Sequence, residues 1–244
     1  MGSLFLKSCA TCITMAVLAL PAAATEDTDT PGPRGWENNL GISYERHHGS
    51  WRVAFPDAEI NYGVGERLQL LLGMPYVRSR EAGEARSSGF GNITTGAKWR
   101  FFDDEASGTA LAIFPQLSWN SSSATASRGL ETRGYSFLMP LVAGYKRGDT
   151  GFYAEFGRNF VQEGPHEWQA GLKVLHQCLP VLECRVELEH SRVPRDGGQT
   201  TASVGGKLKL QEGLILNVSG GRDIAGAKEH RRGLVMYIGL QFLR

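Results

Sequence analysis

The residues of this chain that could do covalent or metal chemistry are few, and the cysteines are the clearest of them. Cys178 and Cys184 flank the five-residue segment LPVLE. In an oxidising compartment, an even pair of cysteines this close in sequence favours a disulfide bond that staples a turn. A metal site is less favoured, because no histidine or cysteine lies nearby at the spacing of zinc ligands.

Enzymatic chemistry has no motif to support it. Barrels that hydrolyse or transfer lipids need a nucleophile and a base near the membrane surface. The chain has scattered serines but no G-x-S-x-G motif. Its six histidines are His47, His48, His166, His176, His190 and His230. We therefore expect no enzyme, no cofactor and no metal site. A membrane lipid-modifying hydrolase stays as the least favoured alternative.

Charged side chains recur at alternate positions between apolar ones, and we predict that they line the interior of a barrel. A wet lumen suits them, because opposite charges can pair there. The predicted lumen-facing residues are Asp57, Glu59, Lys98, Arg100, Glu155, Lys173, Arg185, Glu187, Glu189, Lys207 and Lys209.

The stretch 58–76, AEINYGVGERLQLLLGMPY, shows which elements must carry these charges. Apolar residues alternate with polar ones up to Tyr62, a turn follows at 63–66, and alternation resumes from Leu68 to Tyr76. A period of two is typical of a β-strand with two different faces. Aromatic residues at both ends of the apolar face suggest two membrane interfaces.

The same unit recurs along the chain and predicts about twelve strands. They are expected at 36–46, 52–62, 68–76, 90–102, 109–119, 134–146, 150–160, 166–177, 184–190, 200–210, 214–220 and 233–243. Pro115 cannot donate to a strand ladder, so it predicts a local bulge or weak pairing. Spans near ten residues and connections that alternate between short and long favour an all-β, antiparallel up-and-down transmembrane β-barrel over a soluble sandwich.

The first residues are typical of an export signal. Lys7 precedes the apolar segment ITMAVLAL, and Ala22-Ala23-Ala24 offers a cleavage site before Thr25. Cys9 and Cys12 would leave with the signal. The domains predicted are a signal peptide at 1–24, a disordered leader at 25–35 and an outer-membrane barrel at 36–244.

Composition excludes some function classes. The chain is 41% hydrophobic and 21% charged with a mean hydropathy of −0.24, values that fit neither a disordered chain nor a bundle of membrane helices. A net charge of +1 and the lack of a basic patch argue against nucleic-acid binding.

Several short motifs resemble the outer-membrane family named for the meta-pathway of phenol degradation. They are EINYGV at 59–64, LQL at 68–70, MPY at 74–76, GFGNI at 89–93 and GAKW at 96–99. The likeness is clearest over about Phe55 to Trp119. Asn92 departs from the aspartate that such sequences often have in the glycine segment.

The resemblance implies a transport barrel without catalytic residues, in the outer membrane of a Gram-negative bacterium. Its expected function is that of a channel or transporter for passive uptake of small apolar or aromatic compounds. The expected partners are outer-membrane lipid and a small solute, and the oligomeric state stays open. The alternative is a closed structural barrel whose charges pair across the interior.

Overall fold

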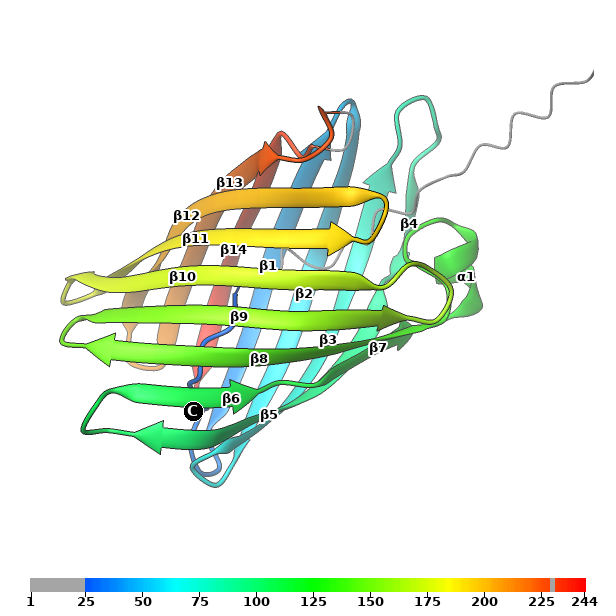
Figure 1. The fold of residues 1–244 in the computed structure, drawn as a ribbon. Coiled ribbons are helices and arrows are strands. Elements are labelled where there is room, and N and C mark those ends of the chain that lie inside the picture. The colour runs from blue at the N-terminus through cyan, green and yellow to red at the C-terminus, as the bar shows by residue number, and fades with distance from the viewer. Residues whose placement is uncertain (1–24, 229–230) are drawn as a thin grey trace, which may run out of the picture.

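The structure, a computed structural model, describes residues 25–228 and 231–244 (Figure 1). The expected signal peptide at 1–24 lies outside the described residues. The strands are β1 (Trp36–His47), β2 (Ser50–Val64), β3 (Leu68–Arg80), β4 (Ser87–Phe90), β5 (Asn92–Asp104), β6 (Thr109–Ile113), β7 (Gln116–Asn120), β8 (Tyr135–Arg147), β9 (Thr150–Val161), β10 (Glu167–Leu179), β11 (Leu182–Val193), β12 (Gly197–Gln211), β13 (Leu214–Ala225) and β14 (Leu234–Leu243).

These strands form one closed antiparallel barrel. Consecutive strands pair with each other except at β4–β5 and β6–β7, and β1 pairs with β14 to close the sheet. β4 and β5 both pair with β3 and are two parts of one strand interrupted at Gly91. β6 and β7 likewise both lie between β5 and β8, with the interruption at Phe114 and Pro115. The prediction of twelve barrel strands is confirmed, and the second interruption falls at the predicted proline.

The outer face of the barrel is apolar. Apolar and polar residues alternate along each strand, so the apolar residues face outward when the polar ones face the lumen. Leu70, Leu172 and Val204 are 45%, 58% and 63% exposed, although each lies within a strand. Hydrocarbon, not water, is the solvent that suits such a surface. The apolar exterior therefore indicates that the barrel is embedded in a membrane.

The connections identify the two ends of the barrel. One end has the turns 65–67, 105–108, 148–149, 180–181 and 212–213, and it also holds the start of β1 and the end of β14. The other end carries the longer connections 81–86, 121–134, 162–166 and 226–233 and the short ones 48–49 and 194–196. Short turns and both termini mark the periplasmic end of such barrels.

Aromatic pairs gather near both ends of the wall. Two pairs lie at the periplasmic end, Trp36 with Tyr62 at 4.7 Å and Tyr145 with Phe152 at 6.4 Å between ring centroids. Two more lie toward the extracellular end, Tyr76 with Phe90 at 5.4 Å and Phe137 with Phe160 at 6.4 Å. Aromatic residues gathered at both ends of a membrane barrel form girdles at the two membrane interfaces.

The connection after β7 contains the short helix α1 (Ser123–Ser127). Within the described part of the chain, no helix is long and apolar enough to span a membrane.

Cys178 and Cys184 are bonded to each other across the periplasmic turn between β10 and β11, with their Cα atoms 5.9 Å apart. The bond closes a short loop, so chain entropy predicts a stabilisation of about 2 kcal/mol. We expect mass spectrometry of unreduced protein from outer membranes to find the two cysteine peptides linked. Two free thiols at these positions would contradict the assignment.

Candidate functional site in the barrel lumen

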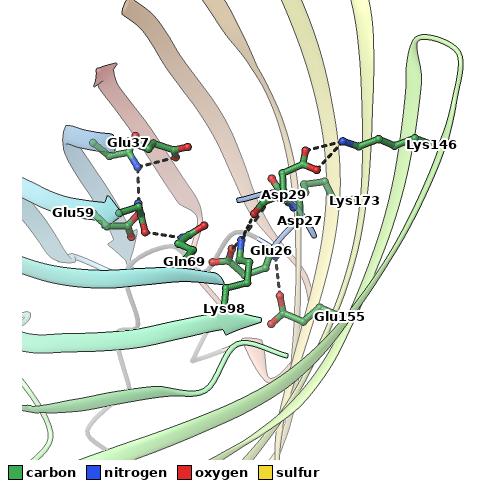
Figure 2. A network of polar contacts seen from close by, with 12 residues as sticks. Glu26, Asp27, Asp29, Glu37, Glu59, Gln69, Lys98, Lys146, Glu155 and Lys173 are labelled. Atoms are coloured by element: carbon green, nitrogen blue, oxygen red, sulfur yellow. Dashed lines mark hydrogen bonds and ion pairs between the residues drawn. The ribbon is translucent and has the colours of Figure 1, made fainter. Parts of the chain in front are cut away.

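Residues 25–30, which we call the lumen segment, lie inside the barrel (Figures 1 and 2). We expected residues 25–35 to be a disordered leader, and the structure corrects this. Thr25 and Thr28 are only 3% and 2% exposed, and Thr30 Oγ1 donates a 2.9 Å hydrogen bond to the carbonyl oxygen of Glu66. The segment runs inward from the periplasmic start of β1, so it occupies part of the lumen.

Ion pairs with the barrel wall hold the lumen segment in place. Lys98 Nζ on β5 lies 2.9 Å from Glu26 Oε2 and 3.7 Å from Asp27 Oδ1. Lys173 Nζ on β10 lies 3.5 Å from Asp27 Oδ2. Figure 2 shows these two carboxylates, with Asp29, converging on lysines from different strands of the wall. Closer to the periplasm, Lys146 Nζ is 2.7 Å from Asp29 Oδ1.

The lysines also control the ionisation of Asp27. Burial disfavours its carboxylate, but the positive charges of Lys173, Lys98 and Lys207 outweigh that cost and hold the pKa of Asp27 well below its ordinary value. Asp27 therefore stays charged, and the lumen segment stays paired, over the whole physiological pH range.

Inward-facing glycines make room for the segment. A Cβ atom on Gly171 of β10 would lie 2.2 Å from Thr25 Oγ1, and one on Gly144 of β8 would lie 2.7 Å from Thr28 Oγ1. Real Cβ atoms do not approach other atoms this closely, so side chains at these two positions would displace the segment. The inner wall of the barrel is therefore complementary to the lumen segment in shape as well as in charge.

A cavity of about 360 Å³ adjoins the lumen segment. Its ionisable lining is unequal in sign, with seven acidic side chains and three basic ones: Glu26, Glu37, Glu45, Asp57, Glu59, Glu131 and Glu155 against Arg52, Arg133 and Arg185. Two of the seven acidic side chains already have a basic partner outside the lining, because Glu26 pairs with Lys98 and Glu45 pairs with Arg232. Five acidic side chains then remain against the three arginines. Paired charges thus close one part of the lumen, and the open part is acidic.

Amides hold part of this acidic wall. Asn61 Nδ2 and Asn39 Nδ2 donate hydrogen bonds of 2.8 and 3.2 Å to Glu59 Oε1, and Gln69 Nε2 donates one of 2.7 Å to Asn61 Oδ1 (Figure 2). These bonds fix the carboxylate of Glu59 at the surface of the cavity.

The connection 121–134 covers the cavity from the extracellular side. Arg52 on β2 pairs with the carboxylate of Glu131, and Leu130 is buried in contact with Ala54 and Val77 on the inner wall. Burial raises the pKa of Glu131, and the neighbouring Arg52 acts against that rise. The cavity therefore lies between two constrictions, the lumen segment and this connection.

The predicted lumen residues fall into three groups. Lys98, Glu155, Lys173 and Glu187 contact the lumen segment, and the field of Lys207 acts on Asp27. Asp57, Glu59 and Arg185 line the cavity, whereas Glu189 lies beyond Glu187 on the same face of β11. Arg100 and Lys209 lie near the periplasmic rim, where Arg100 bonds the carbonyl oxygen of Glu66 at 2.9 Å and Lys209 is exposed.

The residues that divide the lumen were not predicted from the sequence. Glu26, Asp27 and Asp29 fell within the expected disordered leader, and Glu131 was not expected in the interior. One signal was present: three acidic residues within TEDTDT lie just before the first strand of a barrel whose predicted inner face carries several lysines and arginines.

The low pKa of Asp27 makes its contribution to stability depend on pH in a defined direction. A carboxylate whose pKa is depressed on folding stabilises the folded state above its unfolded pKa, near 3.9, and loses that contribution as pH falls toward the folded pKa. We expect Asp27→Asn to lower the free energy of unfolding by a constant amount from pH 8 to about pH 4. Below pH 4 the difference in stability between the native protein and the variant should become smaller. Denaturant titrations of refolded protein at several pH values would measure it.

Asp29→Asn is the matched control, because Asp29 and Lys146 are about half exposed and such pairs contribute about 0–1 kcal/mol. Equal effects of the two substitutions would contradict the role assigned to Asp27.

Comparison with solved structures shows a shared fold. An outer membrane channel from Pseudomonas putida F1 superposes with a TM-score of 0.69 at 14% identity, over 91% of this chain and 99% of that one. The NanC porin superposes with a TM-score of 0.62 at 6% identity, over 84% and 98% of the two chains. The KdgM porin has a TM-score of 0.55 at 12% identity, over 84% and 98%. No protein-family model matches the chain, and no curated protein matches it significantly.

At these identities the likeness establishes the fold, which is that of outer-membrane barrels of Gram-negative bacteria. The apolar exterior and the two aromatic girdles fit the same location. The family named for phenol degradation, which the sequence motifs resemble, is not identified by these comparisons.

Proposed function

We propose that the protein is an outer-membrane channel for the passive uptake of small solutes, with a lumen narrowed by its own residues 25–30. The observation that carries this proposal is the polar cavity of about 360 Å³ enclosed in the barrel beside the ion-paired lumen segment. A barrel filled by its own side chains would have no such space. The printed descriptions of the three similar structures, one channel and two porins, support the same class.

Small apolar or aromatic compounds are the solute class that we propose. The motifs shared with the phenol-degradation family support it, and the size of the cavity suits a single-ring compound better than an oligosaccharide. The lining contributes polar groups that hydrogen-bond a hydroxylated ring, among them Asn39, Ser43 and Tyr237. The excess of acidic side chains in the cavity lining disfavours anionic solutes. The mixture of positive and negative charges expected from the sequence would not select strongly by charge.

A closed structural barrel is the alternative, and a specific observation favours it. Lys98 and Lys173 are only 3% and 6% exposed, so the ion pairs that hold the lumen segment are well shielded from water. If they never separate, the lumen stays blocked.

Two measurements decide between a channel and a closed barrel. In planar bilayers the purified full-length protein should show discrete conductance steps. In vesicles it should admit phenol-sized neutral compounds faster than benzoate-sized anions and faster than disaccharides. Deletion of the gene should slow growth on low concentrations of aromatic carbon sources. No conductance, together with unchanged uptake across the panel, would establish the closed barrel.

A further inference from the structure

We infer that the lumen contains a binding site for the chain's own processed N-terminus, in which the α-ammonium group of Thr25 pairs with the carboxylate of Glu187. The inference concerns how the lumen segment is anchored and does not depend on transport. It builds on the expected cleavage of the Ala24–Thr25 bond.

The geometry places the two groups together. The backbone nitrogen of Thr25 donates a hydrogen bond to Glu187 Oε1, and the next nitrogen, of Glu26, donates one of 2.7 Å to Glu155 Oε2. In the uncleaved chain Thr25 and Glu187 are 3% and 4% exposed. Two consecutive backbone nitrogens thus face carboxylates of β9 and β11.

The charges around Thr25 leave a place for one more cation. Glu155, Glu187 and Glu189 bring three carboxylates to this part of the wall, where Lys98 and Lys173 act on Glu155 and Arg232 acts on Glu189. Among the described residues, Arg185 is the only side chain in an ion pair with Glu187, with its Nε 3.7 Å from Glu187 Oε2. Lys173 lies opposite Glu187 in the β10–β11 register, but its ammonium group pairs with Asp27. Buried carboxylates are costly without a partner of opposite charge.

Hydrolysis of the Ala24–Thr25 bond supplies that cation. A signal peptidase adds one water across the bond, which leaves a carboxylate on Ala24 and a primary amine on Thr25 that is protonated at neutral pH. Before cleavage the Thr25 nitrogen is a neutral amide with one N–H; afterwards it carries a full charge and three donors. Gly171, where a Cβ would collide with Thr25, leaves space at this site for the terminal residue. Processing therefore completes the ion pair that fixes the inner end of the lumen segment.

The reactivity of the Thr25 amine tests the inference. Intact mass and N-terminal sequencing of protein from outer membranes should first show that the mature chain begins at Thr25. An acylating reagent at pH 7 reacts with an unpaired α-amine, of pKa about 7.7–8.0, in preference to lysines of pKa about 10.4. We expect the Thr25 amine of the native chain to be acylated about tenfold more slowly than that of Glu187→Gln, the factor for a pKa raised by one unit.

Glu183→Gln is the matched control, because Glu183 lies on the same face of β11 nearer the periplasmic end, whereas the Thr25 nitrogen bonds Glu187. It should leave the acylation rate unchanged. The dependence of the rate on pH separates pairing from mere occlusion: Glu187→Gln should shift the midpoint to lower pH, whereas occlusion would change the rate without moving the midpoint.

A second variant keeps the test decisive if Glu187→Gln does not fold. A refolded chain with one extra glycine before Thr25 moves the amine by about 3.5 Å along the chain and keeps every barrel residue. It should be acylated as fast as Glu187→Gln. A mature chain that begins elsewhere, or equal rates and midpoints in the native and extended chains, would overturn the inference. Conductance is not a readout here, so failure of the proposed transport would leave this result intact.

Discussion

Deletion of residues 25–30 should raise the conductance of the purified barrel several-fold. These residues occupy part of the lumen next to a cavity of about 360 Å³, so their removal should widen the path through the barrel. Conductance rises with the cross-section of the narrowest part of the pore, and we expect the lumen segment to form that part. Single-channel recordings of full-length and deleted protein under the same salt conditions would measure the change.

Variants that remove positive charges from the wall test whether the lumen segment limits conductance, without shortening the chain. Lys98→Met with Lys173→Met removes the buried partners of Glu26 and Asp27, so the lumen segment should leave the lumen and the conductance should approach that of the deletion. Lys146→Met is the control, because its pair with Asp29 is half exposed and contributes little. A conductance that stays at the full-length value after the deletion would show that the constriction lies elsewhere, for example at the connection 121–134.

Leu172→Arg should destabilise the barrel by about 2–4 kcal/mol, because it places a charge in hydrocarbon near the middle of the membrane. Leu172 is 58% exposed on the outer face of β10, midway between the two aromatic girdles, and it lies beside Leu188 and Ala154 on the neighbouring strands. Leu70→Arg, on the outer face of β3, should behave in the same way. Unfolding of the refolded protein in lipid vesicles by urea would give the free energies.

Val181→Arg is the matched control at a different depth. Val181 is 48% exposed in the periplasmic turn after β10, where the cost of an arginine falls to about 0–1 kcal/mol. The stability change should thus depend on depth along one hairpin. Equal changes at positions 172 and 181 would contradict the assignment of this face to lipid.

The alternation of apolar and polar residues predicted most of the barrel, because a few residues of each strand are enough to identify its two faces. The alternation through 58–76 required a hairpin, and its recurrence predicted the number of strands that the structure has. Pro115 predicted a local bulge or weak pairing because proline removes a ladder donor, and β6 ends just before this region. Strand ends were less predictable: β11 extends from Leu182 to Val193, beyond the expected 184–190, because pairing with β12 continues where the alternation fades.

By itself, the sequence determined the wall of this protein: which residues face lipid, which face the lumen, and how many strands close the barrel. These properties follow from the period of the pattern and from the bilayer, and both are local to each strand. Only the tertiary structure decided what fills the lumen. Glu26, Asp27 and Asp29 have no periodicity, and their partners Lys98, Lys146 and Lys173 lie far along the chain on separate strands. Closure of the sheet brings those lysines around one axis, and that convergence turns a polar leader into a buried segment and leaves the rest of the lumen acidic.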